Sequence, residues 1–470
     1  MKFFKSTLLL LISIVIFSCS RDELSPENVQ VQSFIWRGLN AYYLWQGEIP
    51  DLSDNKFISD QQLFNYLSDK GEPANFFNSL LYQKGTIDKW SWIVDDYVAL
   101  EQAFQGTTRT TGMEFGIAEF KSDPTKVFGY VRYVVAGTDA ANKGVTRGMI
   151  FTEVDGTELT QQNYRSLLFS NNNAYTIHLA DFNAGDPITN ATTINLTKST
   201  NTENPILVAK TLDEGGKKIG YLMYNGFISN FDMQLNQVFA QFKADNITEL
   251  IVDLRYNGGG SVNTATYLAS MITGQFKGEI FAKQQWNSKF MNALADPDNL
   301  NNRFTDKIDS QSINSLNLTN VYFITTDGSA SASELLMNGL VPHITVKSVG
   351  TKTHGKYVGS ITLYDSPNFY NKVNINPNHK WAMQPIVLEI VNKDGNNDKD
   401  GIDPTVEFPE DYGNLGILGD KAEPLLARTL QLITTGSRAF SLQRVPFELK
   451  TISSSKANSP TYNNMYVELE

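Results

Sequence analysis

The spacing of hydrophobic residues changes along the chain and divides it into three regions. From residue 31 to about 107, apolar positions recur every three or four residues, which predicts helices; Ser59 and Asp60 are placed to cap the second of them. From about 108 to 198, short β-rich runs alternate with Gly, Asp and Asn turns, which predicts strands, for example at 127–135 and 149–154. From about 217, strand and helix patterns alternate.

The alternating region predicts an α/β sheet covered by helices. Residues 275–315 are polar and are expected to be irregular. Strands are expected at 219–224, 250–254 and 321–325, and helices at 235–242, 264–272 and 332–340. In the helical region the aromatic residues are expected to form core rather than a binding surface; they are Trp36, Tyr42, Tyr43, Trp45, Trp90 and Trp92.

The first residues of the chain have the features of an export signal. Lys2 and Lys5 precede an apolar stretch at 8–17, which is too short for the roughly 20 residues of a membrane-spanning helix. The stretch ends in Ile-Phe-Ser-Cys, and this resembles a bacterial lipobox, in which Cys19 becomes the lipidated first residue. A plain signal peptide ending near a cysteine is the alternative. We expect a signal peptide at 1–19 and a polar tether at 20–30.

The residues after Cys19 indicate where in the cell the protein is located. Ser20 does not resemble an inner-membrane retention signal, and the acidic pair Asp22-Glu23 resembles the export tag of surface lipoproteins in the Bacteroidetes. These features predict a lipid-anchored protein of a Gram-negative cell envelope, in the outer membrane; exposure at the cell surface is a further option that the acidic pair favours. Because Cys19 is the only cysteine, an internal disulfide is excluded, and the mature chain must be held by its core.

Composition narrows the class of function. Hydrophobic residues make up 41% and charged residues 19%, which is typical of a globular protein. The net charge of −11 disfavours nucleic acid as a partner, since nucleic-acid binding depends on Lys and Arg neutralising phosphates.

Three segments with candidate chemistry each follow a predicted strand, where open α/β sheets bind their ligands. Residues 253–260 end in three glycines, whose backbone N–H groups can approach an oxyanion closely; a tight turn is the alternative. Ser331 lies in a turn of small residues before a helix, where an N-cap, with Glu334 completing a capping box, is the alternative. Residues 350–356 supply Lys352 and Lys356, either of which can serve as a base if burial lowers its pKa.

Together the three segments resemble the tail-specific peptidases, also called C-terminal processing proteases. The family motif Asp-Leu-Arg-x-Asn-x-Gly-Gly matches residues 253–260, and its Ser-Ala-Ser-Ala-Ser-Glu run matches 329–334. The resemblance implies that Ser331 is the nucleophile and that the lysine 25 residues later, Lys356, is the general base. It spans about two-thirds of the chain, roughly 108–410. Many members have a Gln that orients the lysine at the position of Ser360, so the orienting role is in doubt here.

The resemblance also implies a PDZ domain before the catalytic core. Phe115, Gly116 and Ile117, after Glu114, occupy the place of the loop that binds a peptide's terminal carboxylate, and residues 140–156 resemble a later PDZ helix and strand. Glu114 would repel that carboxylate unless it points away. A PDZ fold kept only as a spacer or lid is the alternative.

The implied fold is multidomain α+β. It has an N-terminal helical domain at 31–107, a PDZ-like β domain at 108–198, an α/β catalytic core of crotonase-like type at 199–436 and a tail at 437–470. The implied reaction is peptide-bond hydrolysis through an acyl-enzyme, with the N–H of Ala332 and that of Gly258 or Gly259 stabilising the oxyanion. The expected partners are unstructured or C-terminal polypeptide segments and, through Cys19, the membrane.

The sequence also bears on cofactors and on competing functions. No metal or organic cofactor is expected; residues 396–407 fit a loose EF-hand pattern, but Pro404 interrupts it and a solvated turn is favoured. A catalytically weak or inactive peptide-binding lipoprotein with the same fold is the competing function, and only Ser360 favours it. Acyl transfer on an acyl-CoA-like substrate, on a related core, is disfavoured by the export signal and the PDZ-like insert.

Overall fold

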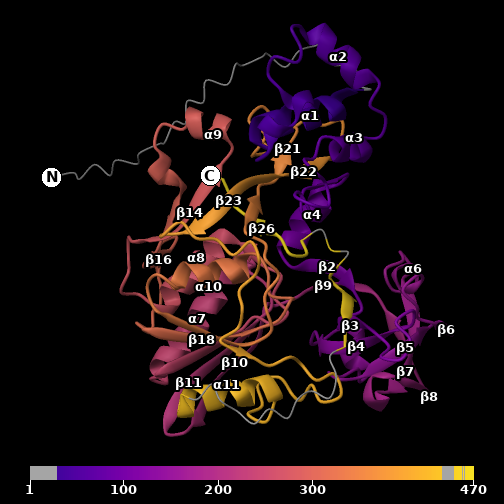
Figure 1. Cartoon of the computed structure of the whole chain (residues 1–470), viewed down its shortest axis with the longest axis vertical. Helices are drawn as coiled ribbons and strands as arrows, with labels where there is room; N and C mark the ends of the chain where they lie inside the picture. The colour runs from indigo at the N-terminus through magenta and orange to yellow at the C-terminus, as the bar shows by residue number, and fades with distance from the viewer. Residues whose placement is uncertain (1–28, 437–448, 458, 460, 470) are drawn as a thin grey trace.

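The computed structural model describes residues 29–436, 449–457, 459 and 461–469 (Figure 1). The predicted signal peptide, Cys19 and most of the tether lie outside these residues. Within them, no helix has the length and apolar character needed to cross a membrane.

The N-terminal region is helical, as the hydrophobic spacing predicts. The second helix begins at Ser59, whose side chain accepts a hydrogen bond from the N–H of Gln62. Side chains of the first helix, including Ile35 and Leu39, belong to the same hydrophobic cluster as the catalytic region, so these helices do not have a core of their own. The elements are α1 (Gln30–Tyr42), η2 (Gln46–Glu48), η3 (Pro50–Leu52), α2 (Asp60–Ser68), α3 (Pro73–Ser79), β1 (Trp92–Val94) and α4 (Tyr97–Phe104).

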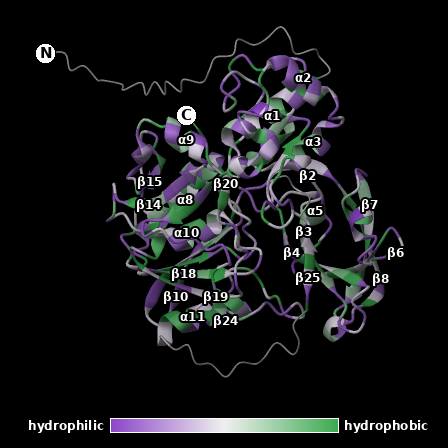
Figure 2. Ribbon diagram, turned by 45° about the horizontal axis from the view of Figure 1, so that its top comes forward, coloured by the Kyte–Doolittle hydropathy of each residue, from purple (hydrophilic) through white to green (hydrophobic). Residues whose placement is uncertain are grey.

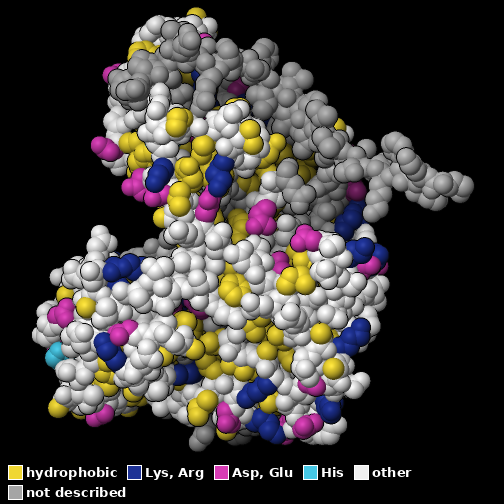
Figure 3. All heavy atoms as spheres, turned by 180° about the vertical axis from the view of Figure 1, so that it is seen from behind, with side chains coloured by type: hydrophobic (Ala, Val, Ile, Leu, Met, Phe, Trp, Pro, Cys, Tyr) yellow, Lys and Arg dark blue, Asp and Glu magenta, His cyan; other side chains and the backbone are white. Residues whose placement is uncertain are grey.

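The second region is a β domain. Its sheet runs in the order β3-β4-β5-β7-β8 around a separate hydrophobic cluster, and the antiparallel pair β2–β9 connects it to the rest of the chain. Its elements are β2 (Thr107–Thr110), β3 (Met113–Glu119), β4 (Val127–Val134), α5 (Asp139–Asn142), β5 (Ile150–Val154), β6 (Thr157–Glu158), α6 (Tyr164–Leu168), β7 (Ala174–Asp181), η4 (Asn183–Gly185), β8 (Ile188–Thr197) and β9 (Ser199–Thr202). Viewed from behind, this domain is the lobe at the lower left, and the surface is hollowed between it and the lobe above (Figure 3).

The third region contains a mostly parallel sheet in the order β10-β11-β12-β18-β19-β24. Alternate residues of the strands face opposite sides: Leu222 and Val252 share a hydrophobic cluster with residues of α7, α8 and α10, whereas Tyr221 and Ile251 share one with residues of α11. In Figure 2, α8 and α10 lie on one side of the sheet and α11 on the other. Its elements are β10 (Ile206–Glu214), β11 (Lys217–Tyr224), η5 (Ser229–Phe231), α7 (Asp232–Ala244), β12 (Glu249–Asp253), α8 (Val262–Ile272), β18 (Asn320–Thr325), α10 (Ala332–Leu340), β19 (Thr345–Gly350), β24 (Val406–Glu407) and α11 (Pro424–Thr435).

A second sheet in this region runs in the order β13-β26-β20-β23-β14-β15. Its elements are β13 (Gly260–Ser261), β14 (Ile280–Trp286), α9 (Ser288–Ala293), η6 (Pro297–Leu300), β15 (Asn301–Arg303), β20 (Val358–Ser360), β23 (Ile386–Asn392) and β26 (Met465–Tyr466). The expectation that 275–315 is irregular is therefore wrong at β14 and α9. The apolar part of β14 is short, and its main partner β23 lies about a hundred residues away, so local pattern does not identify it.

Smaller pairings complete the fold: β16 (Lys307–Ile308) with β17 (Gln311–Ser312), and β22 (Ala382–Gln384) with both β1 and β21 (Leu363–Tyr364). After the undescribed residues 437–448 the chain returns to two places. Strand β25 (Thr451–Ser454) pairs antiparallel with β3 of the β domain, and β26 lies between β13 and β20. In Figure 1 this part of the chain is yellow and passes from the β domain up to the second sheet.

Candidate active site

The three candidate segments follow three neighbouring parallel strands. The glycine turn follows β12, the Ser331 turn follows β18, and the Lys356 segment follows β19; β18 pairs with both of the others. Because carboxyl ends of parallel strands meet at one edge of a sheet, the three segments come together there, as the sequence predicts. A Cβ added to Gly259 would lie 2.7 Å from Ser331 Cβ, so the absence of a side chain allows this approach.

Ser331 has a strained backbone. Its φ is +66° and its ψ is −116°, a combination unusual for a residue with a Cβ, at the N-terminal end of α10. The side chain is fully buried, and its Oγ has no hydrogen-bond partner among the described residues, so neither a histidine nor Lys356 bonds to it there. The turn therefore holds an unbonded hydroxyl at the positive end of a helix dipole.

Glu334 connects the serine turn to the lysine segment. Its Oε2 accepts the N–H of Ser331 at 2.7 Å and that of Lys356 at 2.9 Å. Its Oε1 accepts Thr353 Oγ1 and the Gly355 N–H, both at 2.6 Å. Burial raises the pKa of this carboxyl, while the four hydrogen bonds act in the opposite direction. Spacing within the sequence indicates only a capping role for Glu334; its bonds to residues 353–356 depend on the fold.

The two lysines lie in different environments. Lys356 is buried, and burial lowers its pKa to about 7, although Asp88 and Glu334 act to raise it. The side chain of Lys352 is half exposed and forms an ion pair with Asp403 at 3.3 Å. The environment of Lys356 therefore favours a neutral amine near neutral pH.

The N-terminal region forms one wall around Lys356. The Trp90 ring centre lies 5.9 Å from Lys356 Nζ, and Asp88 is held by the Tyr43 hydroxyl at 2.7 Å and by the N–H of Ser91 at 2.9 Å. The expectation that the aromatic residues of this region belong to the core holds for Tyr42 and Tyr43, which are buried. Trp90 is only half buried and borders the site, which sequence spacing does not indicate.

The hydrogen bonds of the structure show which backbone N–H groups remain available to bind an oxyanion. The Gly259 N–H donates to Asn257 Oδ1 at 2.9 Å, so it is already engaged. The N–H groups of Ala332 and Gly258 have no acceptor within the described part of the chain. The N–H groups of Ala332 and Gly258 are therefore the two that remain free to bind an oxyanion. Gly259 contributes through its lack of a side chain, which lets the turn approach Ser331.

Ser360 does not touch the lysine. Its Oγ lies 2.6 Å from Gln384 Oε1 and 3.1 Å from Asn464 Oδ1. Lys356 Nζ instead donates to the carbonyl of Asn463 at 2.6 Å and contacts Asn464 Oδ1 at 3.4 Å. The residues nearest the amine thus come from the C-terminal part of the chain, to which the sequence assigns no role.

A buried ion network holds the glycine turn. Arg255 binds Asp253 and Glu423, both at 2.7 Å. Arg147 of the β domain joins it through Glu410 at 2.9 Å. Although burial alone would raise it, the two arginines lower the pKa of Glu410 to about 2. The first residues of the 253–260 motif therefore anchor the turn and link it to the β domain.

The predicted peptide-binding residues lie on β3. Phe115 and Ile117 point into the core of the β domain, whereas the backbone of this stretch pairs with β25. The Phe115 carbonyl accepts the Ser455 N–H at 2.9 Å, and the Phe115 N–H donates to Ser455 Oγ at 3.1 Å. Glu114 is buried and accepts Ser455 Oγ at 2.5 Å.

A cavity of about 590 Å³ connects the β domain to the catalytic turn. Glu114 and Phe115 line one end, and Gly258 and Gly259 line the other. Asn464 contributes to the wall beside the glycines. The cavity is long enough to join the two places where peptide chemistry is predicted.

The loop with a loose EF-hand pattern is flanked by strands β23 and β24, not by helices. A Cβ on Gly355 would lie 2.7 Å from the Lys399 carbonyl, so the loop packs against the Lys356 segment. Burial raises the pKa of Asp398 to about 6.

Comparison with known families agrees with this arrangement. The model of peptidase family S41 matches residues 218–408, and that of the peptidase S41 N-terminal domain matches residues 30–92. Together they cover more than half of the chain, including all three segments of the site and the region that contains Asp88 and Trp90. The chain belongs to peptidase family S41.

Curated relatives are C-terminal processing proteases. The chain is 26% identical over 232 residues to a chloroplastic C-terminal processing peptidase of Tetradesmus obliquus, covering 47% of this chain and 46% of the relative. It is 23% identical over 210 residues to a carboxyl-terminal-processing protease of Picosynechococcus sp., covering 41% and 46%. The match spans about half the length of these curated relatives.

Solved structures share the fold more completely. A Bacteroides fragilis NCTC 9343 protein assigned to the S41 proteases superposes with a TM-score of 0.64 at 22% identity, over 86% of this chain and 97% of that one. The photosystem II D1 C-terminal processing protease superposes with a TM-score of 0.51 at 18% identity, over 89% and 100%. These similarities establish a mixed α/β multidomain fold with an N-terminal domain.

Proposed function

We propose that this chain is an exported, lipid-anchored serine endopeptidase that hydrolyses peptide bonds of extracytoplasmic proteins with Ser331 and Lys356. The observation that carries the proposal is the shared carboxylate of Glu334. It binds the backbone N–H groups of both residues, so a strained serine and a buried lysine are fixed at one edge of the sheet. The family supports serine peptidase chemistry.

In the proposed reaction, neutral Lys356 accepts the proton of Ser331 Oγ, and the oxygen attacks the carbonyl carbon of the scissile bond. The N–H groups of Ala332 and Gly258 stabilise the resulting oxyanion, and the loss of one such donor typically lowers the rate about 10²–10³-fold. Lys356 then gives its proton to the leaving amine, which leaves an acyl-enzyme on Ser331. Water hydrolyses this ester with Lys356 as base. The reaction uses no metal or organic cofactor.

We also propose the finer parts of the organisation. Residues 108–198 form a PDZ-like domain that engages substrate segments by strand addition at Phe115, Gly116 and Ile117. Residues 199–436 form a crotonase-like core. Lipidation at Cys19 anchors the chain in the cell envelope of a Gram-negative bacterium. Supporting observations are the edge of β3, where β25 already pairs as an added strand, and the lipobox-like sequence.

The test of catalysis is cleavage of labelled casein, an unstructured polypeptide, by the full-length chain purified in detergent. Ser331→Ala is expected to lower the cleavage rate at least about 10⁴-fold, as nucleophile removal does in serine peptidases. Ser310→Ala, which changes an exposed serine, is the matched control and should retain full activity. If Ser331→Ala cleaves as fast as the wild type, or the wild type cleaves nothing, the chain is instead a peptide-binding lipoprotein.

The test of anchoring is metabolic labelling with a fatty-acid analogue. The wild-type chain is expected to take up the label, and Cys19→Ser is expected to take up none. Equal labelling of the two would rule out Cys19 as the lipidated residue.

A further inference from the structure

The catalytic residues are covered by the chain's own C-terminus. We call the described residues 449–457, 459 and 461–469 the C-terminal segment. Ser331 is fully buried and Lys356 nearly so, and Asn463 and Asn464 of the segment are themselves buried beside them. The Asn464 carbonyl lies 2.6 Å from where a Cβ on Gly259 would be. A polypeptide therefore cannot reach Ser331 while the segment is in place.

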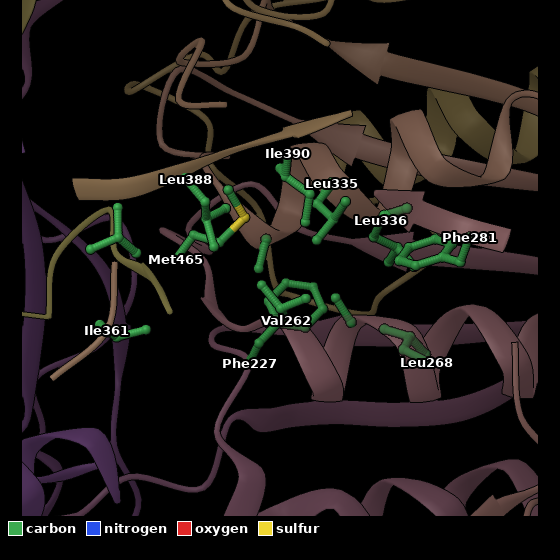
Figure 4. Packing of buried hydrophobic residues seen from close by; sticks show 14 of the residues in the cluster. Phe227, Val262, Leu268, Phe281, Leu335, Leu336, Ile361, Leu388, Ile390 and Met465 are labelled. Atoms are coloured by element: carbon green, nitrogen blue, oxygen red, sulfur yellow. The ribbon is translucent and has the colours of Figure 1, made fainter. Parts of the chain in front are cut away.

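The segment lies in the site as an extended peptide. Strand β26 is inserted between β13 and β20 and is parallel to both, with pairs Gly260–Met465 and Ser360–Tyr466. The Val467 N–H donates to the Ser360 carbonyl at 3.0 Å. The Met465 side chain is fully buried beside Leu388, in the cluster drawn in Figure 4. The site thus offers main-chain pairing on two sides and an apolar pocket, which suit a bound polypeptide.

The same segment occupies the peptide-binding edge of the β domain. Strand β25 pairs antiparallel with β3 at Ser453–Ile117 and Ser454–Gly116. The intervening residues Ser455, Lys456 and Ser459 line the cavity that leads to the glycine turn. The cavity therefore runs from the β3 edge to the glycine turn beside Ser331, and the segment forms its wall along this length.

Charge at the start of this path favours a basic side chain. Lys456 Nζ binds Glu203 at 3.0 Å, and Glu114 lies close enough to act on the charge of Lys456. Glu203 is also held by the Tyr133 hydroxyl at 2.7 Å. Burial raises the pKa of Glu114, whereas Glu203 forms the ion pair with Lys456. A terminal carboxylate placed here would meet Glu203, so this edge is suited to an internal segment with a lysine or arginine, unlike the loops by which PDZ domains bind a terminal carboxylate.

The C-terminal segment packs imperfectly beside Ser331 and Lys356. Asn463 Oδ1, Asn464 Nδ2 and Ser331 Oγ are buried without hydrogen-bond partners among the described residues. Buried polar atoms without partners are costly, and this cost disappears when the segment leaves. The contacts at Lys456 and Met465 thus hold the segment, while those at the catalytic residues favour its release.

We propose that the C-terminal segment is a built-in competitor that occupies the substrate path, and that the path selects polypeptides with a basic residue at the position of Lys456. This proposal rests on the proposed function, because the path is a substrate path only in a peptidase. Displacement of the segment opens the path from β3 to Ser331 to a second polypeptide.

The test uses the full-length chain with Ser331→Ala, so that nothing is hydrolysed and the outcome does not depend on peptidase activity. Lys456→Glu places a negative charge against Glu203 and Glu114. It is expected to increase hydrogen–deuterium exchange about tenfold at residues 113–119 and 258–261, and to tighten the binding of a labelled synthetic peptide of residues 449–469 about tenfold. Fluorescence anisotropy measures the binding.

Lys450→Glu is the matched control, because Lys450 makes the same type of ion pair, with Glu119, on a side chain that is 73% exposed. It should leave both measurements unchanged, and a synthetic peptide carrying K456E should bind about tenfold more weakly than the natural one. Unchanged exchange in Lys456→Glu, or equal effects of Lys450→Glu, would overturn the proposal. If Lys456→Glu does not fold, Glu203→Gln should shift both measurements about threefold in the same direction, and no shift would overturn it.

Discussion

The two sheets of the catalytic region contribute to the site in different ways. In the parallel sheet, β12, β18 and β19 are each followed directly by a segment with candidate chemistry, and each strand pairs with its neighbour along the sheet. In the second sheet, neighbouring strands come from residues near 260, 465, 360 and 386. The first sheet carries the proposed reacting groups on short local units, whereas the second is assembled from distant segments, one of which lies beside those groups.

This difference has a physical origin. A strand followed by a turn and a helix is a local unit, whose loop positions side chains as soon as the strand is in the sheet. The second sheet requires β13 and β26, which lie about two hundred residues apart in the sequence, to pair, and this pairing covers only two residues of each strand. Changes in the loops of the parallel sheet should therefore have large effects on catalysis, and changes in the second sheet should have smaller effects on the same measurement.

The largest effect is expected for Lys356→Met. Removal of the base leaves Ser331 without a proton acceptor, and kcat for labelled casein should fall about 10⁴-fold. Lys352→Met is the matched control, since Lys352 is half exposed and paired with Asp403, and it should change kcat less than about threefold. A larger loss of kcat in Lys352→Met than in Lys356→Met would mean that Lys352, and not Lys356, is the general base.

Arg255→Met should have the next largest effect, on stability. It leaves the buried Asp253 and Glu423 carboxylates without their common cation, and the free energy of unfolding should drop by about 3–5 kcal/mol. Urea denaturation followed by tryptophan fluorescence measures the change. Arg303→Met at the edge of the second sheet removes an exposed pair with Asp298 and should cost no more than about 1 kcal/mol. Similar losses in both variants would contradict the anchoring role of Arg255.

The pH dependence should follow the state of Lys356. Its pKa is lowered to about 7, chiefly by burial, and the base acts in its neutral form, so kcat/KM should rise as pH increases through 7. The increase between pH 6 and pH 8 should be about tenfold. Cleavage of labelled casein at several pH values, with thermal melting at each to verify folding, gives the profile. A rate that is flat or that falls over this range would mean that Lys356 is not the base.

The smallest effect is expected for Ser360→Ala. The lost hydroxyl bonds to Gln384 and Asn464 and does not touch Lys356, so the change removes about one ordinary hydrogen bond. The rate of casein cleavage should change less than about fivefold. A loss approaching that of Lys356→Met would show that Ser360 orients the lysine in the active state, and would weaken the distinction between the two sheets.

Much of the fold follows from the pattern of the sequence. The helix expected at 332–340 is α10, the cap at Ser59 is formed, and the strands near 219–224, 250–254 and 321–325 are β11, β12 and β18. These elements have strong apolar periodicity or begin at a capping residue. Strand β14 is missed because its continuous apolar part is short and its partner β23 is distant in sequence. Helix α9 is missed because it is short, and Asn287 caps it.

The sequence by itself predicts which residues react, because the motifs at 253–260, 329–334 and 350–356 are contiguous and each lies in one strand-to-loop unit. Only the tertiary structure decides their surroundings. Glu334 joins the serine and the lysine, Asp88 and Trp90 flank Lys356, and the C-terminal segment binds the Lys356 amine. These partners are distant in sequence, and hydrogen bonds, burial and pKa depend on which groups the folded chain brings within a few ångströms.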